Sequence, residues 1–526
     1  MNCPNCNAPL EEGARFCPNC GTPVQTAAAQ PEEPVYEEPQ QEYQPQYEQA
    51  PVQEEAKPFP VKLAALAGAA VVGLIVLIAV IANLFSGSGK KNMITAIQPS
   101  SEDAEVLVIS EAGNKIFKKT VDSSVSSSYY SLDSSMELIR TSGKILYYVQ
   151  ANKIEKIAEE VTNAWISDDG STAVYISDGS LYVAKIGKKG TKIAGSVVTN
   201  SICVAPDGSA VGYAVQSEDD ASVLIGYIWD GGKEATSLGK NKVAIALASK
   251  AQYVYYVRLD DNNAMYVQKK YNDETKVKLN DTRATLYLNQ DHTVCYLYNG
   301  EKTVYCAKAG EKQSLFSYSV TLKGHDLKSK SNSVRGTSAV TYNVKNFTNQ
   351  FFYNASNERI IRLNNKLEAE TVAKSSSTLY VAADGKTIVY YYNEKIRQVN
   401  GSKTDPEPVD LVSEIKSSSD LLGVLEDGKT ICYMKDKEFF VQKGTAKPVK
   451  LLDEEPDDLQ IYNGKVILYC IDNVLYGSTG GKATKYATFS DDIVTISSNG
   501  KMVVVALKDK SVQFSTDAKK FVKLYE

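Results

Sequence analysis

Four of the chain's nine cysteines lie in its first 20 residues, in two C-x-x-C pairs. Cys3 and Cys6 form the first pair and Cys17 and Cys20 the second, with residues 7–16 between them. Each pair supplies two thiolates from one tight turn, and two such turns complete a tetrahedral Zn–S4 site. Because four thiolates leave no open position for water, we expect one structural Zn²⁺ ion rather than a catalytic one. Two disulfides or four unrelated thiols are the alternative.

Residues 1–24 bury too little apolar surface to fold alone, so the metal would supply the folding energy. The stretch "CPNCNAPLEEGARFCPNCGTPV", with Phe16 before the third cysteine and Gly21 after the fourth, resembles the short zinc ribbon at the N-terminus of many bacterial, especially Gram-positive, membrane proteins. Asn7 stands where that module usually has glycine, and asparagine tolerates the same left-handed backbone. The resemblance implies a cytosolic structural zinc finger whose partner is usually unknown, and it does not imply DNA binding.

The rest of the chain offers little catalytic chemistry. Its two histidines, His292 and His325, lie in no metal or triad pattern, and we expect His292 to be an exposed residue of a hairpin turn. No G-x-S-x-G elbow is present. The stretch "GSTGGKAT" is one residue short of a phosphate loop and has Ala483 where Ser or Thr would hold magnesium, so we interpret it as a turn. The acidic clusters "SEDDAS" and "LDDNNAM" lack calcium-loop spacing and should cap hairpins. No catalytic residue is predicted.

Three segments separate the expected zinc ribbon from the C-terminal part of the chain. Residues 25–60 are rich in Pro, Gln and Glu and predict a disordered linker. A transmembrane helix is expected over 61–85, because 63–85 carry no charge and are long enough to cross a bilayer, and 86–92 form a spacer. Lysines flank both ends, so the basic-residue rule gives no orientation. Reduced thiolates persist in the cytosol, which predicts a cytosolic N-terminus and an extracytoplasmic C-terminal part.

Residues 93–526 repeat a pattern of strand, Asp/Asn-Gly turn, strand, polar turn and strand, as in "WISDDGSTAVYISDGSLYVAKI" from Trp165 and "LGVLEDGKTICYMKDKEFFVQK" from Leu422. Asp-Gly and Asn-Gly supply the positive φ of a two-residue hairpin turn. The anchor glycines are Gly170, Gly208, Gly385, Gly428, Gly464 and Gly500. Where neighbouring repeats both carry one, the spacing of about 40 residues suits a four-stranded propeller blade. We therefore expect a mainly β protein.

The repeat "VAPDGSAVGYAV" resembles those of the TolB and WD40-like β-propellers, which implies a β-propeller ectodomain of four-stranded blades over 93–526. The length leaves room for ten or eleven units, so we expect one large or irregular propeller, with two fused propellers as the alternative. The irregular parts should be 93–163 and 310–375. Five cysteines in apolar strand segments of separate blades predict buried free thiols; they are Cys203, Cys295, Cys306, Cys432 and Cys470.

Together these features predict a single-pass cell-membrane protein that binds rather than catalyses. It would act as a sensor, scaffold or assembly factor whose propeller binds a protein, peptide or glycan, while the zinc ribbon binds a cytosolic protein. The 33 tyrosines could serve such contacts, although tyrosine is also ordinary β-strand composition. The alternatives are a transmembrane regulator whose ribbon touches nucleic acid, or a lyase or glycosidase in the propeller channel. Ten acidic against two basic residues in 1–60 disfavour nucleic acid.

Overall fold

The structure of the protein is a computed structural model, and it describes residues 93–99, 104–110, 116–121, 129–131, 136–150, 153–270, 272–307, 311–325, 327–334, 337–404, 406–498, 500 and 502–525. The expected zinc ribbon, linker, transmembrane helix and spacer lie outside these residues. Contacts divide the chain into two units, Met1–Ser86 and Gly87–Glu526, and all described residues belong to the second. Among the described residues, no helix is both long and apolar enough to cross a membrane.

The turn after the first strand of a repeat is built by an aspartate and a residue of positive φ. At Gly208 (φ +62°) the amide donates to Ala205 O at 2.9 Å, and the Asp207 carboxylate accepts from the amide of Ser209 at 3.1 Å. Ala205 and Ala210 close the loop through a bond of 2.9 Å, so four residues lie between them. At this turn the expected length of two residues is therefore wrong, but all six anchor glycines do have positive φ.

Within the described residues, alternating apolar residues and these turns produce 45 strands. The first are β1 (Met93–Pro99), β2 (Ala104–Ser110), β3 (Ile116–Val121), β4 (Tyr129–Ser131), β5 (Met136–Arg140), β6 (Leu146–Gln150), β7 (Lys153–Ala158), β8 (Val161–Ile166), β9 (Thr172–Ser177), β10 (Ser180–Lys185), β11 (Thr191–Gly195), β12 (Cys203–Val204), β13 (Val211–Gln216), β14 (Leu224–Trp229) and β15 (Thr236–Lys240). Next come β16 (Lys242–Leu247), β17 (Tyr253–Arg258), β18 (Ala264–Lys269), β19 (Asn272–Asn280), β20 (Thr285–Leu288), β21 (Val294–Tyr298), β22 (Thr303–Ala307), β23 (Glu311–Phe316), β24 (Thr321–Lys323), β25 (Ser329–Val334), β26 (Thr337–Tyr342), β27 (Phe351–Asn354), β28 (Arg359–Leu363) and β29 (Ala369–Lys374). The last are β30 (Leu379–Val381), β31 (Thr387–Tyr391), β32 (Lys395–Asn400), β33 (Val409–Ser413), β34 (Leu421–Val424), β35 (Thr430–Lys435), β36 (Glu438–Lys443), β37 (Val449–Leu452), β38 (Asp458–Tyr462), β39 (Val466–Ile471), β40 (Val474–Ser478), β41 (Thr484–Thr488), β42 (Ile493–Ser498), β43 (Val503–Leu507), β44 (Val512–Ser515) and β45 (Val522–Tyr525). The part of the chain that the structure describes also has three single-turn 3-10 helices: η1 (Thr199–Ser201), η2 (Ser249–Ala251) and η3 (Ser418–Asp420).

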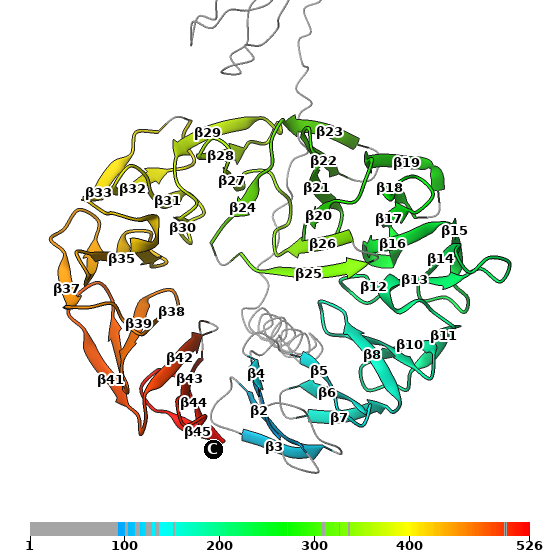
Figure 1. Ribbon diagram of the computed structural model, residues 1–526, viewed down its shortest axis with the longest axis horizontal. Helices are drawn as coiled ribbons and strands as arrows, with labels where there is room; N and C mark the ends of the chain where they lie inside the picture. The colour runs from blue at the N-terminus through cyan, green and yellow to red at the C-terminus, as the bar shows by residue number, and fades with distance from the viewer. Residues whose placement is uncertain are drawn as a thin grey trace, which may run out of the picture. The chain divides into compact units, whose positions relative to one another are not determined.

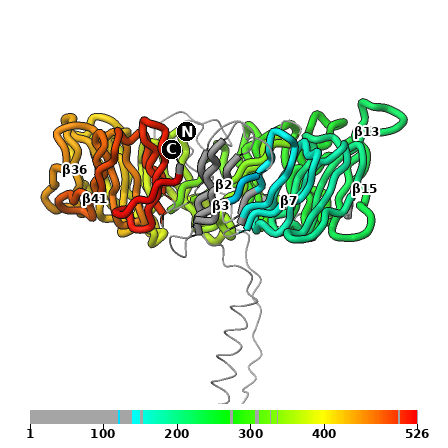
Figure 2. The backbone as a smooth tube through the Cα atoms, turned by 90° about the horizontal axis from the view of Figure 1, so that it is seen from below, coloured from blue at the N-terminus to red at the C-terminus, as the bar shows by residue number. Residues whose placement is uncertain are grey.

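The described strands form eleven sheets, nine of them four-stranded. Figure 1 shows that the sheets follow one another around a ring in chain order, and that β42–β45 lie beside β2 and β3. Seen from the side, the same sheets form a flat disc (Figure 2). The prediction of a mainly β fold of four-stranded sheets is confirmed, and the single ring agrees with the expected propeller.

Two parts of the ring depart from the repeat, and both lie where irregular blades were expected. In 93–163 one sheet has the order β3-β2-β1-β4 and the next, β5-β6-β7, has three strands. Between β24 and β27, which belong to one sheet, the chain inserts the β25–β26 hairpin into the preceding sheet. There β26 pairs in parallel with β20, from Thr285 opposite Ser338 to Leu288 opposite Thr341, giving a six-stranded sheet. Figure 1 shows this hairpin on the inner side of the ring, beside β12 and β16.

The hydrophobic core lies within and between neighbouring sheets. One cluster joins β12–β19 to β20 and β21 and includes the fully buried Val254 and Leu286. Val334 and Ala339 of the hairpin, 1% and 5% exposed, belong to the same cluster. Since burying an apolar side chain contributes about 1.5–3 kcal/mol, this packing anchors the hairpin although most of β25 is polar.

Candidate functional site

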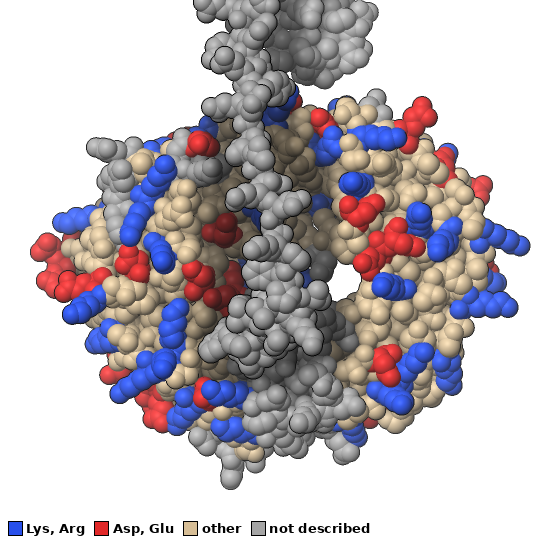
Figure 3. Space-filling model, turned by 180° about the vertical axis from the view of Figure 1, so that it is seen from behind, with Lys and Arg blue, Asp and Glu red and all other residues tan. Residues whose placement is uncertain are grey.

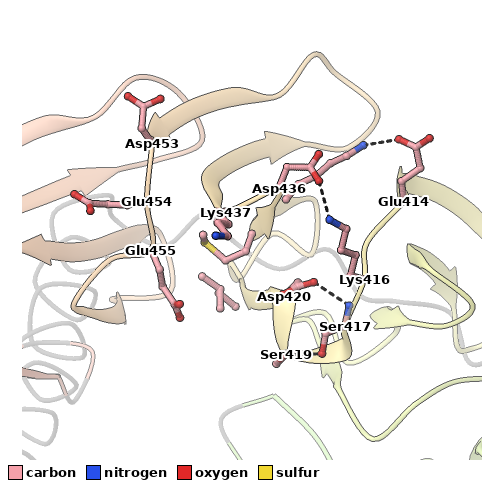
Figure 4. A pocket seen from close by; sticks show the side chains of 13 residues that line it. Glu414, Lys416, Ser417, Ser419, Asp420, Asp436, Lys437, Asp453, Glu454 and Glu455 are labelled. Atoms are coloured by element: carbon pink, nitrogen blue, oxygen red, sulfur yellow. Dashed lines mark hydrogen bonds and ion pairs between the residues drawn. The ribbon is translucent and has the colours of Figure 1, made fainter.

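A pocket of about 690 Å³ opens around η3 and the β35–β36 turn. We call it the charged pocket. It is lined by Glu414, Lys416, Ser417, Ser419, Asp420, Leu422, Met434, Lys435, Asp436, Lys437, Asp453, Glu454 and Glu455 (Figure 4). Loops that follow β33, β35 and β37 supply most of these residues, so the ring brings together segments that are separate in sequence.

Local turn chemistry positions the charged groups. Asp436 and Lys437 both have positive φ, +53° and +69°, as a tight turn between β35 and β36 requires. On the opposite side Ser417 caps η3: its amide donates to the Asp420 carboxylate at 2.9 Å, and its hydroxyl accepts from the amide of Ser419 at 3.2 Å. Both elements are therefore held in place by hydrogen bonds within a few residues.

Some of the charges are paired and some are not. Lys416 Nζ lies 3.2 Å from Asp436 Oδ1, and Lys435 Nζ lies 2.9 Å from Glu414 Oε2. The side chains of Lys437, Glu454 and Glu455 have no hydrogen-bond or ion-pair partner among the described residues. In Figure 4 the Glu455 side chain points toward the middle of the pocket and Glu454 points away from it.

The lining has a net negative charge and includes two apolar side chains. It carries six carboxylates against three lysines, while Leu422 is half-buried and Met434 is 8% exposed. Sequence reasoning missed this pocket because most of its residues come from three loops that are separate in sequence. Elsewhere, acidic and basic side chains alternate over the face drawn in Figure 3, without one extended field of either sign.

His292 is not the exposed turn residue that the sequence predicted. It does occupy the turn between β20 and β21, with φ +59°, but its side chain is only 6% exposed. Nδ1 lies 2.9 Å from Leu247 O and Nε2 lies 2.8 Å from Thr341 Oγ1 on β26. Because a carbonyl only accepts, Nδ1 carries the proton and Nε2 accepts from the threonine. The inserted hairpin buries the ring, and this burial lowers the pKa of His292.

The prediction of buried thiols outside any disulfide is confirmed for Cys203, Cys295, Cys432 and Cys470. Burial raises the pKa of the Cys203 and Cys432 thiols to about 12, so neither is activated as a nucleophile. The expectation that the cysteines lie in separate sheets is wrong for one pair, since Cys295 on β21 is directly opposite Cys306 on β22.

The remaining candidates behave largely as structural residues. His325 is exposed in the loop after β24. In "SEDDAS" the Asp220 carboxylate accepts from the amide of Ser222 at 2.8 Å, which confirms a turn cap. In "LDDNNAM" the hydroxyl of Tyr266 donates to Asp261, and Lys278 lies 2.9 Å from the same carboxylate; these contacts lower the pKa of Asp261. The turn between β40 and β41 holds "GSTGGKAT", where Ser478 donates to Gly481 O at 2.7 Å.

Residues 2–24 match the zinc-ribbon domain family. The predicted zinc ribbon is thus confirmed as a domain, while the ligands Cys3, Cys6, Cys17 and Cys20 and the single ion stay predictions. Within the described part of the chain, no group of three or more His, Cys, Asp or Glu side chains is arranged to hold a metal.

No curated protein matches the chain. Among solved structures, a eukaryotic initiation factor matches at 12% identity over 74% of this chain and 96% of its own, with a TM-score of 0.36. The GH74 enzyme of Niastella koreensis matches at 11% identity over 80% of this chain and 74% of its own, with a TM-score of 0.25. A protein named as TolB from Agrobacterium tumefaciens matches at 12% identity over 50% of this chain and 86% of its own, with a TM-score of 0.24. Likenesses this distant carry no argument about function.

Proposed function

We propose that the protein is a membrane-anchored binding protein without catalytic activity. A zinc ribbon at residues 2–24 contacts a protein in the cytosol, and a helix over 61–85 crosses the membrane. The ring of sheets lies outside the cytosol and binds a partner protein. The zinc-ribbon match and the ring fold support a binding or scaffold role.

The charged pocket is the observation that carries the proposal. Glu455 points into it without a partner among the described residues, and the apolar side chains of Leu422 and Met434 line the same pocket. Glu455 is exposed, and an unpaired carboxylate gains a charge-assisted hydrogen bond when a cation binds beside it. The partner is therefore a protein segment that presents a lysine or arginine beside an apolar side chain.

A photoreactive amino acid placed at Leu422 in the full chain tests this binding in cells of the native host. We expect a discrete cross-linked species at Leu422 and none with the same group at Val494, which is 62% exposed on β42. Glu455→Gln should weaken the cross-link, whereas Glu301→Gln, in an exposed turn after β21, should not. Equal cross-linking at Leu422 and Val494, or an unchanged species in Glu455→Gln, would refute the pocket as the binding site.

Membrane orientation needs a separate measurement. Single cysteines at the exposed positions Lys188 and Lys429, with the native ring thiols replaced by serine or alanine, report which side the ring occupies. An impermeant maleimide should label both in intact cells. Labelling that requires lysis would place the ring in the cytosol and contradict the extracytoplasmic part of the proposal.

A further inference from the structure

The β25–β26 hairpin faces the innermost strands of three successive sheets across a second cavity, of about 200 Å³. We call it the ring cavity. Trp165 on β8, Val204 on β12 and Ala246 on β16 line one wall, and Lys330 and Asn332 on β25 line the other. It is remote in sequence from the charged pocket and shares no lining residue with it.

An ion pair across the cavity makes its lining neutral overall. Lys330 Nζ lies 2.6 Å from Asp168 Oδ1 and 3.5 Å from Ile166 O. His292 also lines the cavity, with its Nδ1 proton donated to Leu247 O. Burial lowers the pKa of the imidazole, which favours its uncharged form. A phosphate or a bare cation would add an unbalanced charge to this lining, so the cavity suits a ligand without net charge.

Two polar groups of the lining lack partners. The indole N–H of Trp165 and the side-chain amide of Asn332 make no hydrogen bond to any described residue. Both side chains are half-buried. An indole offers an apolar body with a single donor, and an amide offers two donors and an acceptor. The lining therefore presents apolar surface and unused hydrogen-bonding groups side by side.

We propose that the ring cavity binds a single sugar ring, either free or at the end of a glycan. Pockets for drug-sized ligands begin at about 300 Å³, so this cavity fits a smaller molecule. A sugar presents C–H groups to the indole and to Val204 and Ala246, and hydroxyls to Asn332. A hydroxyl both donates and accepts, so it can bond to Asp168 and Lys330 while they stay paired. An amino acid, the other neutral candidate, would have to separate that pair.

Tryptophan fluorescence reports on this site directly, because the chain has two tryptophans and only Trp165 lines the cavity. The test uses the full chain with Trp229→Phe, purified in a detergent that has no sugar headgroup. It is titrated with glucose, galactose, mannose and N-acetylglucosamine, and with glycine and leucine as zwitterions. We expect a saturable change for at least one sugar, with half-saturation in the millimolar range that suits so small a ligand.

Asn332→Ala should raise the half-saturating sugar concentration about tenfold, since it leaves a ligand hydroxyl without its partner. Lys330→Met gives a second variant should Asn332→Ala not fold. Lys395→Met is the matched control, because it breaks a comparable ion pair with Asp410 on β33. No saturable response to any sugar up to about 100 mM, well above the millimolar range, would overturn the proposal. So would a response to zwitterions alone, or one that both cavity variants leave unchanged. The charged pocket contains no tryptophan, so failure here does not bear on the proposed partner binding.

Discussion

Replacing His292 by glycine sets two opposing effects against each other. At φ +59° a side chain strains the backbone by about 1 kcal/mol. Four described turns with the same hydrogen bonds have glycine there, at Gly170, Gly208, Gly385 and Gly428, so the turn alone would gain from His292→Gly. Against this gain, Leu247 O loses its donor in a buried position, which costs about 1–3 kcal/mol. Thr341 Oγ1 also loses its imidazole partner, but it borders the ring cavity and can bond to water instead, so this second loss costs less stability. The space left by the imidazole adds about 1 kcal/mol. We expect a net loss of about 2 kcal/mol.

Thermal unfolding of the full chain at pH 7.5 measures the balance, with His292→Asn as the matched variant. Asparagine tolerates positive φ and keeps an amide donor, so its midpoint should lie between those of the native chain and His292→Gly. Hydrogen exchange gives the location: the amides of β25 and β26 should exchange faster in His292→Gly, while those of β34–β37 should not change. A midpoint of His292→Gly equal to or above that of the native chain would refute this reasoning and show that turn strain dominates.

Three further predictions follow from the fold. Gly208→Ala should lower the unfolding midpoint far more than Gly385→Ala, because a Cβ at Gly208 would lie 2.1 Å from Thr172 Oγ1 and one at Gly385 would meet nothing within 4 Å. Equal shifts of the midpoint would show that backbone strain alone determines the loss of stability. Burial lowers the folded-state pKa of His292, so the unfolded chain binds the extra proton first as the pH falls. The stability that the neutral imidazole contributes is therefore present above about pH 6.5 and is lost as the pH falls through the folded-state pKa. Between pH 7.5 and 5.5 the native chain should lose more stability than His292→Asn, although Asp168, Asp291 and Lys330 also act on the imidazole. Metal analysis of the full chain should find one zinc per chain. Replacing Cys17 and Cys20 by serine should abolish zinc binding and leave the unfolding transition of the ring in place. Zinc retained by that variant would contradict a four-cysteine site.

The sequence predicted the ring through features that act within a few residues. An Asp-Gly or Asn-Gly pair favours a left-handed glycine, so all six anchor glycines were placed in turns without knowing the fold, although Gly401 after Asn400 does not adopt positive φ. The same reasoning failed at His292, because what buries it is a hairpin 49 residues further along the chain. The charged pocket was hidden for a related reason: Glu414 and Glu455 become neighbours of one pocket only when the loops of the ring are assembled.

The inserted hairpin also bears on the order in which the protein can mature. Synthesis proceeds from the N-terminus, and domains generally begin to fold as they emerge. The sheet that starts at Thr285 cannot be completed until Tyr342 has been made, because β26 supplies the parallel neighbour of β20. Until then His292 lacks Thr341 and the strands from Val161 to Leu247 face an open centre. A nascent chain stalled before residue 342 would thus hold several finished sheets but no sugar-sized enclosure, and the capacity to bind there would arise in one late step of biogenesis.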